Sequence, residues 1–125
     1  MLRWFIKRNH VFDAKSEVAK NIGMELKRGW GNGYVVIPPI HPWHNKDYND
    51  IDVEVHGGLT FGEPYETLSW PELTEADKGH WIIGFDTCHY SDTKERWPKE
   101  AVREETKILM KQVQFHTGTK YYLIE

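Results

Sequence analysis

The feature that most constrains the fold is an apolar stripe of helical period near the end of the sequence. Its members are Val102, Leu109 and Val113, with Ala101 and Ile108 alongside. Pro98 suits the first turn of such a helix, where the N–H that proline lacks would have no partner, and Gly118 is a natural stop. A helix with one apolar face requires a second apolar layer to cover it.

Short apolar runs upstream predict that this layer is a sheet. Residues 34–37 (YVVI) are predicted to form a short strand. This strand must end at Pro38, because proline cannot donate to a β ladder. Residues 81–86 (WIIGFD) are apolar on both faces, which favours a central strand. Residues 2–7 are predicted to form an edge strand, and residues 62–79, with their prolines and glycines, a loop.

Residues 51–61 carry the clearest strand alternation. The alternating residues are Ile51, Asp52, Val53, Glu54, Val55 and His56. Gly57 and Gly58 break or bulge this predicted strand before residues 59–61 resume it. Asp52 and Glu54 share the polar face, where they are either an acid/base pair or, more simply, carboxylates of a solvated sheet face.

The remaining segments complete the predicted architecture. A short helix is expected around residues 18–26, after Asp13 as its N-cap, and a last strand over residues 121–124. Strands covered by a C-terminal helix make an α+β domain. We therefore expect a single domain over residues 1–125, with a small antiparallel sheet packed by a C-terminal amphipathic helix.

Composition narrows the class of protein. The net charge of -3 argues against a general nucleic-acid binder, and no run approaches the ~20 apolar residues of a membrane span. The first residues lack the apolar run of a signal peptide and Cys88 is the only cysteine, so we expect a cytoplasmic location. Six Trp, six Tyr and five Phe exceed what a small core hides easily, so some are expected at a ligand pocket or a subunit interface.

The sequence contains no recognised catalytic motif. Glycine-rich phosphate loops, H-E-x-x-H and paired C-x-x-C are all absent. Cys88 and His89 are adjacent, and neighbours in a strand point to opposite faces, which argues against a reactive thiolate pair. Residues with metal-ligand chemistry are His41, His44, His56, Asp86, His89 and Asp92. Their spacing matches no known ligand pattern, so neither a metal nor a cofactor is predicted.

Two segments instead suit a nucleotide-like ligand. Residues 56–61 (HGGLTF) offer backbone that a ligand can approach closely, because glycine has no Cβ, between two rings. Arg96 and Trp97 precede the predicted helix, and Lys99 and Arg103 lie in its first turns. A helix start with guanidinium groups nearby suits phosphate, and the aromatic rings suit a stacked base.

The same segments carry a family resemblance. The runs GYVVIP (33–38), DVEVHGGLTF (52–61), WIIGFDTCH (81–89) and WPKE (97–100) are similar to those of the Thoeris anti-defence sponges, small bacteriophage and prophage proteins. The resemblance covers about residues 33–113. It implies an oligomeric protein in the bacterial cytoplasm that binds a cyclic ADP-ribose isomer, made by a TIR-domain enzyme, and sequesters it without cleaving it.

Chemistry and resemblance together select the expected ligand-binding residues. These are His56, Gly57, Gly58, Phe61, His89, Arg96, Trp97 and Arg103. Two alternatives stay open: a small nucleotide hydrolase that uses Asp86 and His89, and an interaction protein that buries its surplus aromatic residues against a host protein. The sponge hypothesis expects no nucleic-acid or membrane partner.

Overall fold

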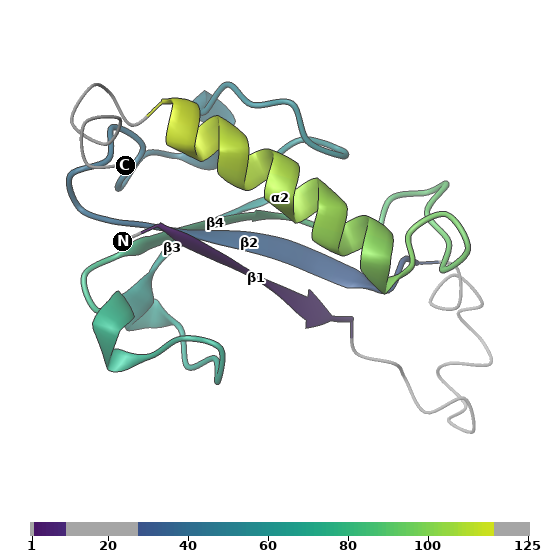
Figure 1. Ribbon diagram of the computed structural model, residues 1–125, viewed down its shortest axis with the longest axis horizontal. Helices are drawn as coiled ribbons and strands as arrows, with labels where there is room; N and C mark the ends of the chain where they lie inside the picture. Colours follow the sequence, from purple (N-terminus) through teal and green to yellow (C-terminus); the bar gives the residue numbers. More distant parts are fainter. Residues whose placement is uncertain (1, 10–27, 117–125) are drawn as a thin grey trace.

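A computed structural model describes residues 2–9 and 28–116 of the chain (Figure 1). Its regular elements are β1 (Arg3–Arg8), β2 (Gly31–Ile37), β3 (Phe61–Pro64), β4 (Trp81–Phe85) and α2 (Lys99–Phe115). The helix predicted around residues 18–26 and the strand predicted at 121–124 lie outside the described residues.

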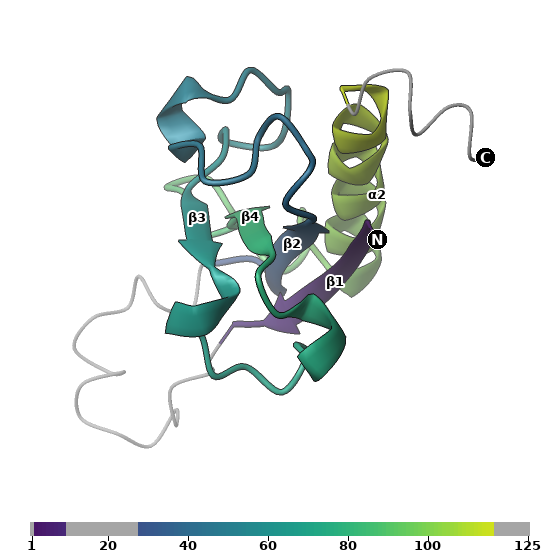
Figure 2. The same cartoon turned by 90° about the vertical axis from the view of Figure 1, so that its left-hand side faces the viewer.

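The four strands form one antiparallel sheet in the order β1-β2-β4-β3. Figure 2 shows the strands in this order beside α2. The prediction of a small antiparallel sheet packed by a C-terminal helix is therefore confirmed. The predicted strands at residues 2–7, 34–37 and 81–86 correspond to β1 at the edge and to β2 and β4 in the centre.

Alternating side chains of the central strands divide the core into two layers. On the face covered by α2, Val35 and Ile83, which are register partners, are fully buried. On the other face, Val36 and Ile82 pair in the same way and are also fully buried. That second face is covered by the connection between β3 and β4, on the side of the sheet away from α2 (Figure 1). Burial on both faces explains why these runs are continuously apolar.

The helical stripe lies against the sheet as predicted, with one exception. Val102, Leu109 and Val113 are fully buried. Ile108 is 48% exposed, so its assignment to the core was wrong. Successive helical residues are turned by about 100°, and a stripe centred on Leu109 therefore places its neighbour towards solvent. Thr106 completes the buried stripe and donates its hydroxyl to the Val102 carbonyl oxygen at 2.7 Å.

The prediction of a strand over residues 51–61 was wrong for residues 51–60. The alternation itself is present, because Ile51 is buried while Asp52 and Glu54 are exposed. The backbone of Glu54 and His56 bonds to side chains of α2, whereas the Thr60 N–H donates to the Gly84 carbonyl oxygen of β4 at 3.0 Å. Gln112 accepts from the Glu54 N–H and donates to the Glu54 carbonyl oxygen, both at 2.8 Å. The segment consequently runs alongside α2 (Figure 1).

The sheet ends in β3 where a loop was predicted. Residues 62–64 belong to this edge strand, and the loop proper begins with a 3-10 turn at Tyr65–Thr67. Pro64 is tolerated because it is the last residue of an edge strand. The loop predicted over residues 62–79 therefore begins three residues later in the structure than the sequence predicted.

Two ion pairs, Arg3–Asp77 and Lys7–Glu72, join β1 to the β3–β4 connection. Arg3 donates from Nε and Nη2 to the Asp77 carboxylate, and from Nη2 to the Glu72 carbonyl oxygen at 2.7 Å. Asp77 is buried and also accepts from the Thr74 N–H at 2.8 Å. The hydrogen bond from Arg3 holds the pKa of Asp77 below its ordinary value, although burial opposes this.

We predict that Leu109→Ala lowers the free energy of unfolding by about 2–5 kcal/mol, because it removes a fully buried side chain. Urea denaturation at pH 7 measures the change. Ile108→Ala is the matched control on the same helix and should shift stability by less than about 1 kcal/mol. An equal decrease in the free energy of unfolding of the two variants would show that α2 packs through a different face.

We predict that Asp77→Asn lowers the free energy of unfolding by about 1–2 kcal/mol at neutral pH. The expected loss is reduced because Arg3 is partly exposed and solvent screens the ion pair. The folded-state pKa of Asp77 lies below the ordinary value of 3.8. The ionised Asp77 carboxylate therefore makes its full contribution to the stability of the folded state above pH 3.8. This contribution is lost as the pH falls through the lower folded-state pKa.

Urea titrations from pH 7 downwards should show the wild-type and Asp77→Asn curves converging at the acid end. Glu75→Gln, in the same turn but exposed, should follow the wild type throughout. A gap between wild type and Asp77→Asn that is independent of pH would show that the ion pair has no such role.

Candidate functional site

Four side chains from distant parts of the sequence meet where the loop after β4 approaches the start of α2. They are His56, His89, Asp92 and Trp97, here called the histidine cluster. The His56 and His89 rings have centroids 5.2 Å apart, and the His56 and Trp97 rings lie 4.1 Å apart with 35° between their planes. The cluster joins residues that are up to 41 positions apart in the sequence.

Two features position His56: a hydrogen bond to α2 and the glycine turn that follows His56 in the chain. The His56 N–H donates to Glu105 Oε2 at 2.7 Å, which fixes the end of the extended segment on the helix. Gly57 and Gly58 then adopt φ values of +69° and +76°. Glycine is favoured at both positions because other residues rarely adopt this conformation. The turn closes with the Gly58 N–H donating to the Val55 carbonyl oxygen at 2.8 Å.

Gly57 also allows His89 to reach the cluster. A Cβ at position 57 would lie 2.1 Å from His89 Nε2, whereas a Cβ at position 58 would meet no atom within 4 Å. The two glycines therefore have different roles. Both provide the turn, and Gly57 alone provides the space for the imidazole ring.

The other side of the cluster is held by the segment that enters β2. The Gly29 N–H donates to the Thr87 carbonyl oxygen at 2.7 Å, and the Trp30 N–H donates to the Trp97 carbonyl oxygen at 2.8 Å. Thr87 is fully buried and donates its hydroxyl to the Gly31 carbonyl oxygen at 2.6 Å. These bonds position the loop that carries His89, Asp92 and Trp97.

The polar groups of the cluster converge on one carboxylate. Asp92 is 1% exposed, and its two oxygens lie 2.8 and 3.0 Å from His56 Nε2. The His89 backbone N–H donates to Asp92 Oδ2 at 3.0 Å. His89 Nε2 is buried and has no hydrogen-bond partner among the described residues. Asp86 Oδ1 is 3.4 Å from this nitrogen, but the pair is within ion-pair distance only and does not form an aligned hydrogen bond.

The structure brings together part of the set predicted from the sequence. His56, Gly57, His89 and Trp97 lie in one place, and Gly58 adjoins them. Phe61 does not, because its ring packs on the opposite face of the sheet against Tyr34 and Trp70.

The two arginines of the predicted set lie before and within the first turns of α2. Arg96 is exposed immediately before Trp97. Arg103 lies on the next turn of α2, with Nη1 3.6 Å from Glu100 Oε2. Glu105 was missed by the sequence prediction. Its position two turns into the helix gave no signal of contact with residue 56.

The other residues with metal-ligand chemistry lie elsewhere. His41 is buried, with Nε2 2.9 Å from the Val113 carbonyl oxygen, and burial lowers its pKa. His44 Nε2 lies 2.8 Å from the Gly79 carbonyl oxygen. Cys88 is exposed, and because β4 ends at Phe85 it is not in a strand as the sequence argument assumed. These side chains therefore have structural partners or no contact with the cluster.

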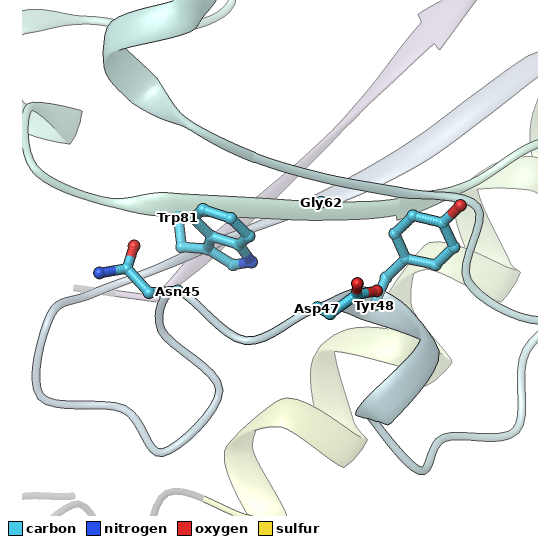
Figure 3. Close-up of a pocket in the computed structure, with 5 residues that line it drawn as sticks. All are labelled: Asn45, Asp47, Tyr48, Gly62 and Trp81. Carbon is cyan, nitrogen blue, oxygen red and sulfur yellow. The ribbon is translucent and has the colours of Figure 1, made fainter.

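A separate pocket of about 250 Å³ lies at the other end of β4. It is lined by Asn45, Asp47, Tyr48, Gly62 and Trp81 (Figure 3). The indole N–H of Trp81 is buried without a hydrogen-bond partner among the described residues. Asp47 is the only charged residue in this lining, so the pocket does not suit an anionic ligand. The histidine cluster is the better candidate for a phosphate-bearing ligand, because Arg96 precedes Trp97 in the chain and Arg103 lies near the start of α2.

A scan against models of protein families, a search of curated proteins and a search of solved structures each found no match for this chain. Within residues 2–9 and 28–116, no helix is both long enough and apolar enough to span a membrane. The fold and the site thus define an α+β domain with a histidine-rich cluster beside a helix start.

We predict that Gly57→Ala and Gly58→Ala each destabilise by about 1–2 kcal/mol, because both place a side chain at positive φ. Only Gly57→Ala should displace the His89 ring, since a Cβ there overlaps its far end. Thermal unfolding measures the first effect, and the imidazole resonances of His89 in NMR spectra measure the second. Unchanged His89 resonances in Gly57→Ala would show that the close approach is absent.

Proposed function

We propose that the protein binds a cyclic ADP-ribose isomer beside the histidine cluster and holds it without cleaving it. The observation that carries the proposal is that His56, Gly57, His89 and Trp97, selected from the sequence for nucleotide chemistry, gather at one place. Such a binder would remove the signal from solution, as the sponge resemblance implies.

The aromatic groups support recognition of a base. Trp97 and His56 are both only partly buried and already lie ring against ring. Tyr90, next to His89, is fully exposed. A base stacked on such rings gains about 1–3 kcal/mol.

The helix start supports recognition of the diphosphate. Arg96 is exposed, and the Arg103 side chain is 38% exposed, so neither guanidinium is closed off by the fold. Each hydrogen bond from Arg to phosphate contributes roughly 1.5–3 kcal/mol. Two such contacts together with a stacked base contribute about 4–9 kcal/mol, so nanomolar binding, at about -12 kcal/mol, requires further contacts.

The proposal includes a homo-oligomer in the bacterial cytoplasm. Ile108 and Phe115 are 48% and 71% exposed and are seven residues apart on α2, which places them on the same side of the helix. Exposed apolar side chains grouped in this way are typical of subunit interfaces. No nucleic-acid partner is part of the proposal.

A nucleotide hydrolase is the second candidate, and one observation favours it. Asp86 Oδ1 lies 3.4 Å from His89 Nε2. A carboxylate beside an imidazole is the arrangement of a general base and the group that orients it. The two candidates differ in the fate of the ligand.

The decisive experiment incubates the pure protein with the cyclic ADP-ribose isomer, removes free ligand, denatures the protein by heat and analyses the supernatant by mass. Intact ligand released on heating is the expected result. A cleaved product would establish the hydrolase instead. Ligand that is never depleted from solution would contradict both candidates and favour a protein partner.

We predict that Arg103→Ala weakens binding about 10- to 100-fold through the loss of one charge-assisted hydrogen bond. Isothermal titration calorimetry measures the affinity. Lys111→Ala removes a cation from an exposed position two turns further along α2 and should bind like the wild type. Equal affinity of Arg103→Ala and wild type would exclude Arg103 from the site.

A further inference from the structure

We propose that His56, His89 and Asp92 form a binding site for a divalent transition-metal ion of the zinc class. The sequence analysis named these three among six residues with metal-ligand chemistry but predicted no metal, because their spacing fits no known ligand pattern. The inference concerns the metal alone and does not depend on the proposed nucleotide ligand.

The first argument is geometric. One ligand atom from each of the three side chains lies within 4.8 Å of the other two. Two of these atoms, His56 Nε2 and Asp92 Oδ1, are already 2.8 Å apart. Zinc bonds to histidine nitrogen and carboxylate oxygen are about 2.0–2.2 Å long, so the ligand atoms of one tetrahedral ion lie roughly 3–4 Å from each other. The three side chains therefore carry ligand atoms at separations close to those that a single ion requires.

The second argument is the unpaired nitrogen. His89 Nε2 is buried and has no hydrogen-bond partner among the described residues. Buried side-chain nitrogens are nearly always paired, and each exception calls for an explanation. A metal ion beside Asp92 supplies the missing partner.

The third argument is charge. Asp92 is 1% exposed and has the imidazole of His56 as its side-chain partner. Asp86 Oδ1, 3.4 Å from His89 Nε2, adds a second carboxylate. Buried carboxylates require a compensating positive charge, which a divalent cation provides.

The surroundings hold the three side chains in place as the second shell of a metal site does. Asp92 Oδ2 accepts from the His89 backbone N–H at 3.0 Å, and the His56 backbone is tied to Glu105 at 2.7 Å. The absence of a Cβ at Gly57 leaves the space that the His89 ring fills. Such outer contacts orient ligands and contribute to metal affinity.

The test uses untagged full-length protein, stripped with a chelator and titrated with Co²⁺ alone. We expect saturable visible absorption of four- or five-coordinate Co²⁺ at one equivalent, displaced by Zn²⁺. His89→Gln should weaken Co²⁺ binding at least about tenfold. This variant removes a side-chain nitrogen that has no hydrogen bond, so the fold should be retained, as circular dichroism will check.

Two further variants complete the test. Gly57→Ala should weaken Co²⁺ binding by displacing His89, whereas His80→Gln, which replaces a histidine outside the cluster, should bind like the wild type. Absorption that does not saturate, or equal affinity of His89→Gln and wild type, would overturn the proposal. Because no nucleotide is present, this result is separate from the outcome of the nucleotide experiment.

Discussion

The packing of α2 on β1 and β2 is the interaction on which the rest of the structure depends. Val102, Leu109 and Val113 are fully buried in the core layer beneath the helix, and the same helix binds the extended segment 51–56 through Gln112 and Glu105. The helix is therefore both a core element and the partner of a backbone that would otherwise need another strand. Its start also adjoins the loop that carries Trp97. Displacement of α2 would consequently remove the core layer and one wall of the histidine cluster together.

The histidine cluster is assembled from two segments that are held independently. Glu105 and the Gly57-Gly58 turn position His56, whereas hydrogen bonds from Gly29 and Trp30 position the loop that carries His89 and Asp92. Polar groups arranged in this way are pre-organised, since little side-chain freedom remains to be lost on binding. The orphan nitrogen of His89 is the point at which the arrangement is incomplete. It links the ligand and metal proposals to a single atom.

The strand prediction over residues 51–60 failed because alternation is an incomplete signal. These residues alternate like a strand, yet they are not part of the sheet. Alternation reports only that one side of an extended segment is apolar, and it does not say which groups satisfy the backbone. In this protein side chains of α2 satisfy it at Glu54 and His56. Phe61 illustrates the same limit, because its position beside the glycine turn did not reveal that its ring faces the opposite layer.

The sequence by itself determined the helix, both central strands and the edge strand β1, because these depend on local periodicity and on the positions of proline and glycine. It also selected His56, Gly57, His89 and Trp97 by their chemistry. Only the tertiary structure decided which residues join them. Asp92 reaches His56 across 36 positions of sequence, and Glu105 reaches it across 49. Contacts over such separations depend on how the helix and loops pack on the sheet, and no local pattern encodes that arrangement.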